Sequence, residues 1–392
     1  MGLFQEEPLL SKILLIGGGS IGKRHLGNLI RSEVSDFVVV DPREERRREA
    51  IESARKAMES LEGSERYPQP LNVVAVSSSE EAYRLGHRFE AVVIAAPPRF
   101  HSEEIRRALA NRVHIFCEKP LAKDDEPWEE LNRLAEEVEA VQLVGMVGYN
   151  YRFLPQLRQV RQMIDQGVVG RVLSVRGTFS QNLWDWHPWE GLNFFMSSKA
   201  LGGGVLLEET HLVDICRWLF GEITHIMAYN GTISSLKDEP SLDVDDLVEM
   251  IVHFQSGAMG SLHMDLFGRY HQKRLEVIGE EATLFWQYDA TDIESNGIQV
   301  WKGKRVRMSP DFTRRVPEQV IATDWEVRNS MYLEEIRYFL NSKKAGWHLR
   351  GDVPDLRDGL KTIGVARAAR RSAHTGRLEP VEPIRELLHG SV

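Results

Sequence analysis

Two short motifs carry side chains of the types used in acid–base chemistry. Lys119 closely follows the apolar run Val113–Phe116, and Glu208 lies three residues before His211. A lysine held partly desolvated at a strand end has its pKa lowered toward use as an acid or base. Residues three or four apart share one face of a helix, so Glu208 and His211 are expected to lie on the same face. The predicted chemistry is proton transfer at a weakly acidic group such as an alcohol.

A glycine-rich turn predicts a dinucleotide cofactor. Residues 17–22 satisfy the pattern G-x-G-x-x-G, directly follow the apolar run Lys12–Ile16 and open a helix-like segment. In that context the glycines allow a tight turn, close approach to a pyrophosphate and close helix–strand packing. The free N–H groups of the helix start then bind phosphate. We expect cofactor contacts from Gly17, Gly19, Ser20, Ile21 and Gly22.

The acidic residue that would select the cofactor is Asp41. It ends the second apolar run, about 20 residues after Gly22, where a carboxylate accepts hydrogen bonds from a free ribose 2′-hydroxyl. A 2′-phosphate would be repelled there, which favours NAD over NADP. Arg43 keeps NADP as the less favoured alternative, because a nearby arginine can accommodate that phosphate.

Further polar and proline-rich segments end the fourth and fifth apolar runs. Ala96, Pro97 and Pro98 close the fourth run, and Glu118 and Lys119 close the fifth. Ligands of parallel sheets bind outside the carboxyl ends of the strands, so these residues are candidates for cofactor contact. An ordinary turn is an equally good interpretation of the two prolines.

The elements around these motifs indicate an α/β fold. Short apolar runs alternate with amphipathic segments over residues 1–150, as in a doubly wound parallel sheet covered on both faces. The expected helices include Arg43–Leu61, Ser102–Ala110 and Pro127–Ala140. The expected strands are Ile13–Ile16, Phe37–Val40, Val73–Val76, Ala91–Ala96, Val113–Phe116 and Val141–Val147.

After about Tyr151 the pattern changes to a second, α+β domain over residues 151–392. Alternating runs joined by short glycine-bearing turns predict a large, mostly antiparallel sheet. Helices are expected at Pro155–Gln166, Glu208–Phe220, Glu326–Lys343 and Leu356–Thr375. The expected strands are Val172–Phe179, His225–Ile233, Leu247–Phe254, Met259–Asp265, Leu275–Ile278 and Thr283–Tyr288.

Composition narrows the function classes. The 392 residues carry 49 Lys and Arg against 58 Asp and Glu, a net charge of −9, so no general attraction to nucleic acid or anionic membrane is expected. No long apolar run or signal-peptide pattern is present. The two cysteines, Cys117 and Cys216, form no Cys-x-x-Cys pair. We expect a cytoplasmic protein without a metal site.

Taken in order, several motifs resemble the Gfo/Idh/MocA family of oxidoreductases. The resemblance covers most of residues 12–289. It implies an N-terminal Rossmann domain, a C-terminal domain with a large open sheet, and a nicotinamide cofactor between them. The motifs are Gly17–Gly22 followed by His25, Ala96-Pro97-Pro98 with Phe100 and His101, Glu118-Lys119-Pro120, Gly148–Phe153, and Gly202-Gly203-Gly204 through His211.

The resemblance also implies roles for individual residues. Lys119 would assist proton transfer from the reacting hydroxyl, Glu118 would lie near the nicotinamide ribose, and His101 would belong to the cofactor site. Family members usually carry an aspartate and, four residues later, a histidine near the substrate. Here the acid is Glu208, only three residues before His211, which leaves the roles of Glu208 and Glu209 open.

Two segments hold candidate substrate contacts. Residues 184–189 contain three tryptophans, and Trp186 and His187 are candidates for stacking on and hydrogen bonding to a sugar. A packed loop or a subunit contact is the competing interpretation. Asn150 and Arg152 follow the last predicted N-terminal strand, and the alternative for both is an interdomain hydrogen bond or salt bridge.

Together these features predict an NAD-dependent oxidoreductase acting on a secondary hydroxyl of a sugar, nucleotide sugar or cyclitol. Bound NAD would perform the redox step while Lys119 and His211 handle the proton. Two alternatives remain: an NAD-dependent glycosidase that oxidises its sugar transiently, and a non-catalytic NAD-binding scaffold or regulator. A sheet with one uncovered face also predicts a homodimer or homotetramer.

Overall fold

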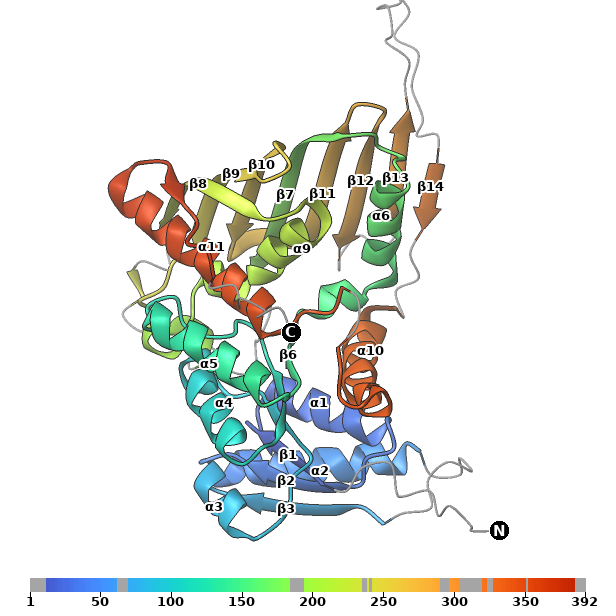
Figure 1. The fold of residues 1–392 in the computed structure, drawn as a ribbon, viewed down its shortest axis with the longest axis vertical. Helices are drawn as coiled ribbons and strands as arrows, with labels where there is room; N and C mark the ends of the chain where they lie inside the picture. The colour runs from blue at the N-terminus through green and yellow to red at the C-terminus, as the bar shows by residue number, and fades with distance from the viewer. Residues whose placement is uncertain are drawn as a thin grey trace, which may run out of the picture.

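The computed structural model describes residues 12–61, 70–183, 194–234, 238–239, 242–289, 296–302, 319–322, 327–349 and 352–384. Within these residues the chain forms one sheet of six strands and one of nine, called here the N-terminal and the C-terminal sheet. The two sheets lie at opposite ends of the molecule, with helices between them and around them (Figure 1).

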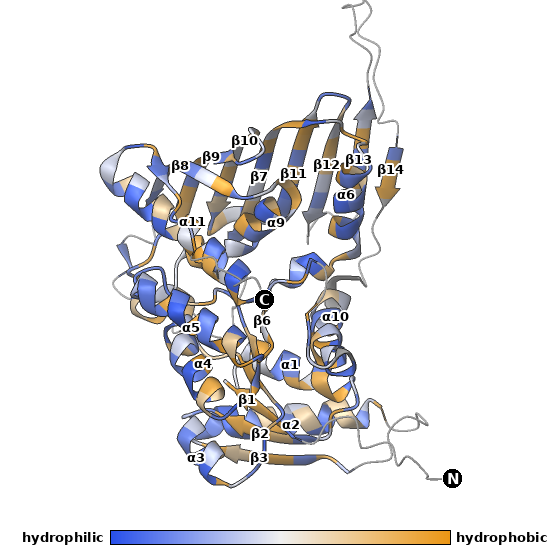
Figure 2. Cartoon of the chain, viewed as in Figure 1, coloured by the Kyte–Doolittle hydropathy of each residue, from blue (hydrophilic) through white to orange (hydrophobic). Residues whose placement is uncertain are grey.

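The N-terminal sheet is parallel, with strand order β3-β2-β1-β4-β5-β6. This is the strand order of doubly wound dinucleotide-binding folds. Its central strands are apolar along their whole length because helices cover both faces (Figure 2). The strands are β1 (Ile13–Ile16), β2 (Asp36–Val40), β3 (Asn72–Val76), β4 (Ala91–Ile94), β5 (His114–Cys117) and β6 (Gly145–Val147).

Helices α1 to α5 connect the strands of this sheet. Their buried positions recur at helical spacing, as Ala50, Ala54 and Ala57 do in α2. The expected alternation of strands and helices is therefore confirmed. The helices are α1 (Ser20–Ile30), α2 (Glu44–Glu59), α3 (Ser79–Arg84), α4 (His101–Ala110) and α5 (Trp128–Ala140).

The C-terminal sheet is mostly antiparallel, with the order β14-β13-β12-β11-β7-β10-β9-β8-β15. One pair, β7 with β10, is parallel. Buried and exposed residues alternate along β9, because only one face of the sheet is covered. The strands are β7 (Val172–Asn182), β8 (Ile223–Gly231), β9 (Leu247–Phe254), β10 (Met259–Asp265), β11 (Phe267–Gly279), β12 (Ala282–Asp289), β13 (Gly297–Lys302), β14 (Gln319–Ala322) and β15 (Glu379–Pro380).

Helices α6, α9 and α11 lie on one face of the C-terminal sheet (Figure 1). Helix α10 instead packs against α1 of the N-terminal sheet and against the single turn η2 (Asn150–Phe153). Segments distant in the sequence therefore hold the two sheets together. The helices are α6 (Pro155–Asp165), α8 (Val205–Glu208), α9 (Thr210–Phe220), α10 (Val327–Asn341) and α11 (Leu356–Thr375).

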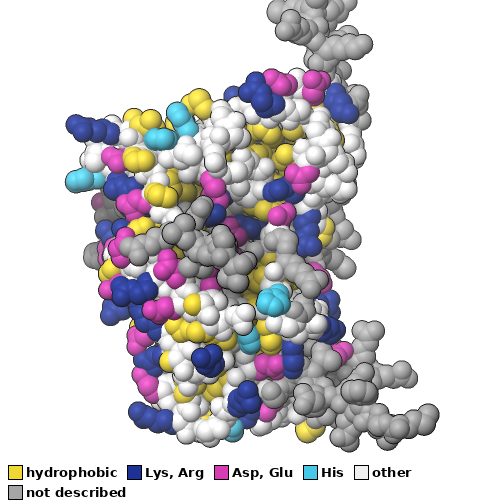
Figure 3. Space-filling view, in the orientation of Figure 1, with side chains coloured by type: hydrophobic (Ala, Val, Ile, Leu, Met, Phe, Trp, Pro, Cys, Tyr) yellow, Lys and Arg dark blue, Asp and Glu magenta, His cyan; other side chains and the backbone are white. Residues whose placement is uncertain are grey.

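Several elements differ from the sequence-based expectation. The helix expected at Glu208–Phe220 is two helices, α8 and α9, which meet at Glu209. Strand β11 begins at Phe267, eight residues before the predicted start. Strands β13, β14 and β15 were not predicted. No helix of the described residues is long and apolar enough to cross a membrane, and acidic and basic side chains are interspersed over the face in Figure 3.

Candidate functional site

The glycine turn after β1 leaves no room for a side chain at two of its glycines, Gly17 and Gly22. The Gly17 N–H donates to the carbonyl oxygen of Val40 at 2.8 Å. Gly17 has a φ of +102°, and a Cβ there would lie 2.5 Å from the carbonyl oxygen of Ala95. A Cβ on Gly22 would lie 1.9 Å from the carbonyl oxygen of Gly17. Helix α1 begins at Ser20 without a side-chain cap, so its first N–H groups are available to a phosphate.

Asp41 is fixed beside this turn. Its side chain is buried, its Oδ2 accepts from the Gly18 N–H at 3.0 Å, and its Oδ1 accepts from the Arg43 N–H at 2.9 Å. The guanidinium of Arg43 is 3.4 Å from Asp41 and is largely exposed. These backbone contacts hold the carboxylate at the end of β2, where a ribose is recognised in this fold. The turn and Asp41 together fit a dinucleotide with a free 2′-hydroxyl.

A cavity of about 880 Å³ extends from the glycine turn to the C-terminal sheet. Its size is in the range of cofactor and substrate pockets. It is also lined by Glu209, whose role the sequence left open, and by residues that were not predicted to belong to the site, among them Tyr151, Gln181, His271 and Lys273. The predicted residues that line it are Gly17, Gly19, Ser20, Ile21, Asp41, Arg43, Ala96, Pro97, Pro98, Glu118, Lys119, Asn150, Glu208 and His211.

Lys119 reaches from the end of β5 to the α8–α9 junction. Its Nζ donates to Glu208 Oε1 at 2.6 Å and to the Glu208 carbonyl oxygen at 3.0 Å. The peptide bond between Lys119 and Pro120 is cis. Although burial alone would lower it, the adjacent Glu208 carboxylate raises the pKa of Lys119 above its ordinary value. The pKa lowering expected from the sequence is therefore wrong, and Lys119 is a charged hydrogen-bond donor.

His211, in the first turn of α9, is the neutral counterpart of this lysine. Its ring makes edge contacts with Tyr149 and Tyr151, with centroids 5.9 and 4.9 Å away. Burial, together with the charges of Lys119 and Lys273, lowers the pKa of His211 well below its ordinary value. Among the described residues its buried Nδ1 has no hydrogen-bond partner. A neutral imidazole with a free nitrogen can accept a proton.

A second buried ion pair lies beside the first. Lys273 Nζ, on β11, is 3.0 and 3.2 Å from the two carboxylate oxygens of Glu209. The same Nζ lies 4.1 Å from the centre of the Phe179 ring. Burial lowers the pKa of Lys273, and Glu209 offsets this only in part. The acidic doublet Glu208-Glu209 was the one sign of this pair in the sequence, and nothing there indicated that Lys273 is the partner of Glu209.

Glu118 forms a buried polar cluster behind the cavity. Its Oε1 is 2.5 Å from His25 Nε2, and its Oε2 accepts from the Lys119 N–H at 3.2 Å. Burial opposes its charge, but the bond to His25 and the charges of His25 and Lys119 together outweigh this and lower the pKa of Glu118. Burial and the charge of Glu118 raise the pKa of Glu335 well above its ordinary value. A ring nitrogen of His25 and carboxylate oxygens of Glu118 and Glu335 lie within 4.8 Å of one another.

Two predicted contacts have other roles in the structure. The ring nitrogens of His101 lie 2.7 Å from the Ala96 carbonyl oxygen and 2.9 Å from that of Pro120. His101 is fully buried and does not line the cavity, so it ties together the loops after β4 and β5. Gly22 likewise does not border the cavity, and its contribution is the close packing against Gly17 described above.

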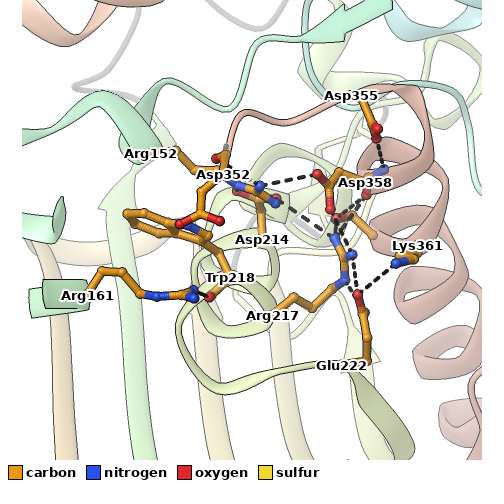
Figure 4. A network of polar contacts seen from close by, with 11 residues as sticks. Arg152, Arg161, Asp214, Arg217, Trp218, Glu222, Asp352, Asp355, Asp358 and Lys361 are labelled. Carbon is orange, nitrogen blue, oxygen red and sulfur yellow. Dashed lines mark hydrogen bonds and ion pairs between the residues drawn. The ribbon is translucent and has the colours of Figure 1, made fainter. Parts of the chain in front are cut away.

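The prediction that Arg152 contacts substrate is corrected by the structure. Its Nε donates to Asp214 at 2.9 Å, one NH group donates to the other oxygen of Asp214 at 2.6 Å, and the second reaches Asp358 at 3.2 Å (Figure 4). Arg152 is buried outside the cavity. The structure contains a salt bridge, as the alternative proposed, but it lies within the second domain, where Arg152 joins η2 to α9 and α11.

The remaining substrate candidates have different outcomes. Asn150 is almost fully buried and borders the cavity. Its Oδ1 has no hydrogen-bond partner in the described part of the chain. Trp186 and His187 lie outside the described residues.

Comparison with known proteins assigns the family. Residues 11–149 match the model of an oxidoreductase family with an NAD-binding Rossmann fold, GFO_IDH_MocA. Residues 157–285 match the GFO/IDH/MocA C-terminal domain. The chain belongs to the Gfo/Idh/MocA family. The resemblance drawn from the motifs is therefore confirmed, as are the NAD-binding Rossmann fold and the C-terminal sheet.

Individual relatives act on small polyols, according to their names. Levoglucosan dehydrogenase of Pseudarthrobacter phenanthrenivorans is 31% identical over 51% of this chain and 56% of its own length. Myo-inositol 2-dehydrogenase of Thermotoga maritima is 24% identical over 95% of this chain and 99% of its own. A levoglucosan dehydrogenase structure with NADH superposes with a TM-score of 0.75 at 24% identity, covering 95% and 99% of the two chains, and so shares the fold.

Proposed function

We propose that this protein is an NAD-dependent dehydrogenase that oxidises a secondary hydroxyl of a sugar or cyclitol. One observation carries the proposal. A single cavity joins a glycine turn and Asp41 at one end to Lys119, Glu208 and His211 at the other. That arrangement provides a cofactor site and a proton-handling site within one enclosure.

The roles of Lys119 and His211 follow from their charge states. Bound NAD would accept the hydride from the carbinol carbon. Lys119, held charged by Glu208, would donate a hydrogen bond to the reacting oxygen and stabilise negative charge on it. Neutral His211 would take the hydroxyl proton. In the reverse direction the protonated imidazole would return that proton.

The polyol substrate class is supported by the relatives' names, levoglucosan dehydrogenase and myo-inositol 2-dehydrogenase. Asn150 supports it too, since this residue lines the cavity and its amide oxygen has no hydrogen-bond partner among the described residues. NAD, rather than NADP, is favoured by the buried carboxylate of Asp41. NADP, the less favoured cofactor, would bind only if the Arg43 guanidinium turned away from Asp41 to contact the 2′-phosphate.

The test is a substrate panel with purified protein and NAD. Levoglucosan, myo-inositol, scyllo-inositol, free aldoses, sugar acids and nucleotide sugars would be followed by NADH absorbance. Mass spectrometry would detect products that have lost two hydrogens. We expect turnover of an uncharged polyol. A glycoside cleaved without net NADH would support the glycosidase alternative, and NAD binding without any turnover would support a scaffold.

The uncovered face of the C-terminal sheet is the proposed contact between copies of this chain. Residues at least 37% exposed on this sheet include Met227, Tyr229, Ile251, Met259 and Phe285, and Met227 pairs directly with Ile251 across β8 and β9. Large exposed apolar side chains gathered on one surface favour a protein contact. We expect a homodimer or homotetramer by light scattering, and a monomer at working concentration would contradict this.

Two organisational proposals complete the description. We place the boundary of the cofactor domain near residue 150, between β6 and η2. A reducing cytoplasmic location is supported by the two cysteines, Cys117 and Cys216, which are both buried and unpaired. Limited proteolysis and cell fractionation would test these two statements.

A further inference from the structure

The floor of the cavity carries two ion pairs side by side. The neighbouring carboxylates of Glu208 and Glu209 lie at the α8–α9 junction. Glu208 pairs with Lys119 from the N-terminal sheet, and Glu209 pairs with Lys273 from the C-terminal sheet. All four residues line the cavity. Only the first pair has a part in the chemistry proposed above.

Folding alone does not account for the second pair. The side chains of Lys273 and Glu209 are 7% and 3% exposed. Burying both charges is costly, and an apolar pair of similar volume is often as stable or more stable. Lys273 already lies against the rings of Phe179 and Tyr151, so a hydrocarbon chain would pack well there. A polar ligand in the cavity would explain why this position holds a charged pair and not an apolar one.

The ammonium group also has donor capacity left for a ligand. A lysine ammonium has three N–H donors, and the two oxygens of Glu209 account for two of them. The Glu209 carboxylate has more lone pairs than Lys273 occupies. A hydroxyl placed beside the pair can therefore accept from Lys273 and donate to Glu209 at the same time.

We propose that Lys273 and Glu209 form a second hydroxyl-binding subsite, which holds the hydroxyl next to the one that reacts. The inference rests on the proposed function and narrows its substrate class to vicinal diols. Because Glu208 and Glu209 are adjacent in the chain, two neighbouring hydroxyls can meet one pair each. The two lysines and two glutamates cancel in charge around a neutral His211, so the site suits an uncharged polyol better than a sugar acid.

The first experiment uses the unaltered protein with saturating NAD and two simple probes, cyclohexanol and trans-cyclohexane-1,2-diol. Each is tested as a substrate and as a competitive inhibitor of polyol oxidation in the panel assay. We expect the diol to have a kcat/KM at least about tenfold higher, or an inhibition constant at least about tenfold lower, than the mono-alcohol. If the protein oxidises a polyol but the diol and the mono-alcohol have equal kcat/KM values or inhibition constants, the subsite is refuted. The proposed function is then unaffected.

The second experiment removes both members of the pair. The double variant E209L/K273M avoids leaving an isolated buried charge. We expect it to bind NAD normally and to lose the preference for the diol over the mono-alcohol. The control R176A/E276A removes an exposed pair across the same strands, β7 and β11, and should keep the preference. A double variant that still prefers the diol overturns the inference, whereas a wild-type protein that oxidises no polyol refutes the proposed function itself.

Discussion

Two groups of buried charges adjoin α9, and they differ in how completely their polar atoms are hydrogen-bonded. In the network of Figure 4, Arg152 and Arg217 direct their guanidinium groups at Asp214, Glu222, Asp358 and nearby backbone. In the cavity, by contrast, Glu208 Oε2 and His211 Nδ1 are buried without a partner among the described residues. Buried polar atoms that are all hydrogen-bonded within the protein indicate a structural role. Buried polar atoms left without a partner beside a cavity indicate a ligand site.

The largest expected effect is on catalysis. Replacing His211 with asparagine removes the proposed base, so kcat for the best panel polyol should fall by roughly 10³-fold. Stability and NAD affinity should remain near wild type, because the lost imidazole nitrogen has no protein partner within the described residues. Steady-state kinetics and thermal unfolding would be measured together. A variant that keeps more than a tenth of the activity would remove His211 from the mechanism.

In the ion-pair network of Figure 4, by contrast, a substitution is expected to lower stability and to leave substrate binding nearly unchanged. The variant Arg152→Met leaves Asp214 and Asp358 buried or half-buried without their main partner, so the free energy of unfolding should drop by about 3–5 kcal/mol. Urea unfolding would measure this. The KM of the folded fraction should hardly change. If the variant unfolds like the wild type but has a greatly raised KM, Arg152 contacts the substrate after all.

A smaller effect is expected at the far end of the cavity. Asp41→Ala removes the carboxylate that holds the Gly18 N–H and would repel a 2′-phosphate. The preference for NAD over NADP, measured as a ratio of dissociation constants, should narrow about tenfold or more. The variant Asp36→Ala, which removes a half-buried carboxylate at the other end of β2, is the control. An unchanged ratio would exclude Asp41 from the cofactor site.

The smallest effect concerns a histidine on the C-terminal sheet that lies between two carboxylates. His263 lies 2.5 Å from Glu249 and 2.7 Å from Asp265, and its bond to Asp265 raises the pKa of His263 from 6.5 to about 9. Its stabilisation is therefore complete below pH 6.5 and lost as the pH rises through about 9. His263→Gln should lower stability by about 1 kcal/mol or less at pH 6. The two proteins should unfold alike at pH 10, and a pH-independent difference would contradict the charge argument.

The sequence was informative wherever function depends on local geometry. The glycine turn, Asp41 and Lys119 each follow a buried strand directly, so their place at the sheet edge could be predicted from the chain alone. Family resemblance added the Glu208–His211 pair, whose shorter spacing is accommodated by the break between α8 and α9 at Glu209.

The parts that were missed depend on pairing between distant segments. Lys273 fell just before the predicted strand Leu275–Ile278, because the polar residues at the start of β11 obscure the apolar alternation that identifies a strand. Only the register of β11 against β7 brings Lys273 over Phe179 and toward Glu209. Arg152 was misplaced for a similar reason, since its partner Asp358 is far away in the sequence, on α11.

The most direct test of the account is deuterium transfer. Myo-inositol and levoglucosan, deuterated at their carbinol carbons, would be incubated with the protein and NAD, and the cofactor would be analysed by mass spectrometry. Direct hydride transfer predicts that deuterium from at least one of these polyols appears in the reduced nicotinamide, even where the cofactor stays bound to the protein. NAD bound at the glycine turn with no deuterium gained from either polyol would contradict it.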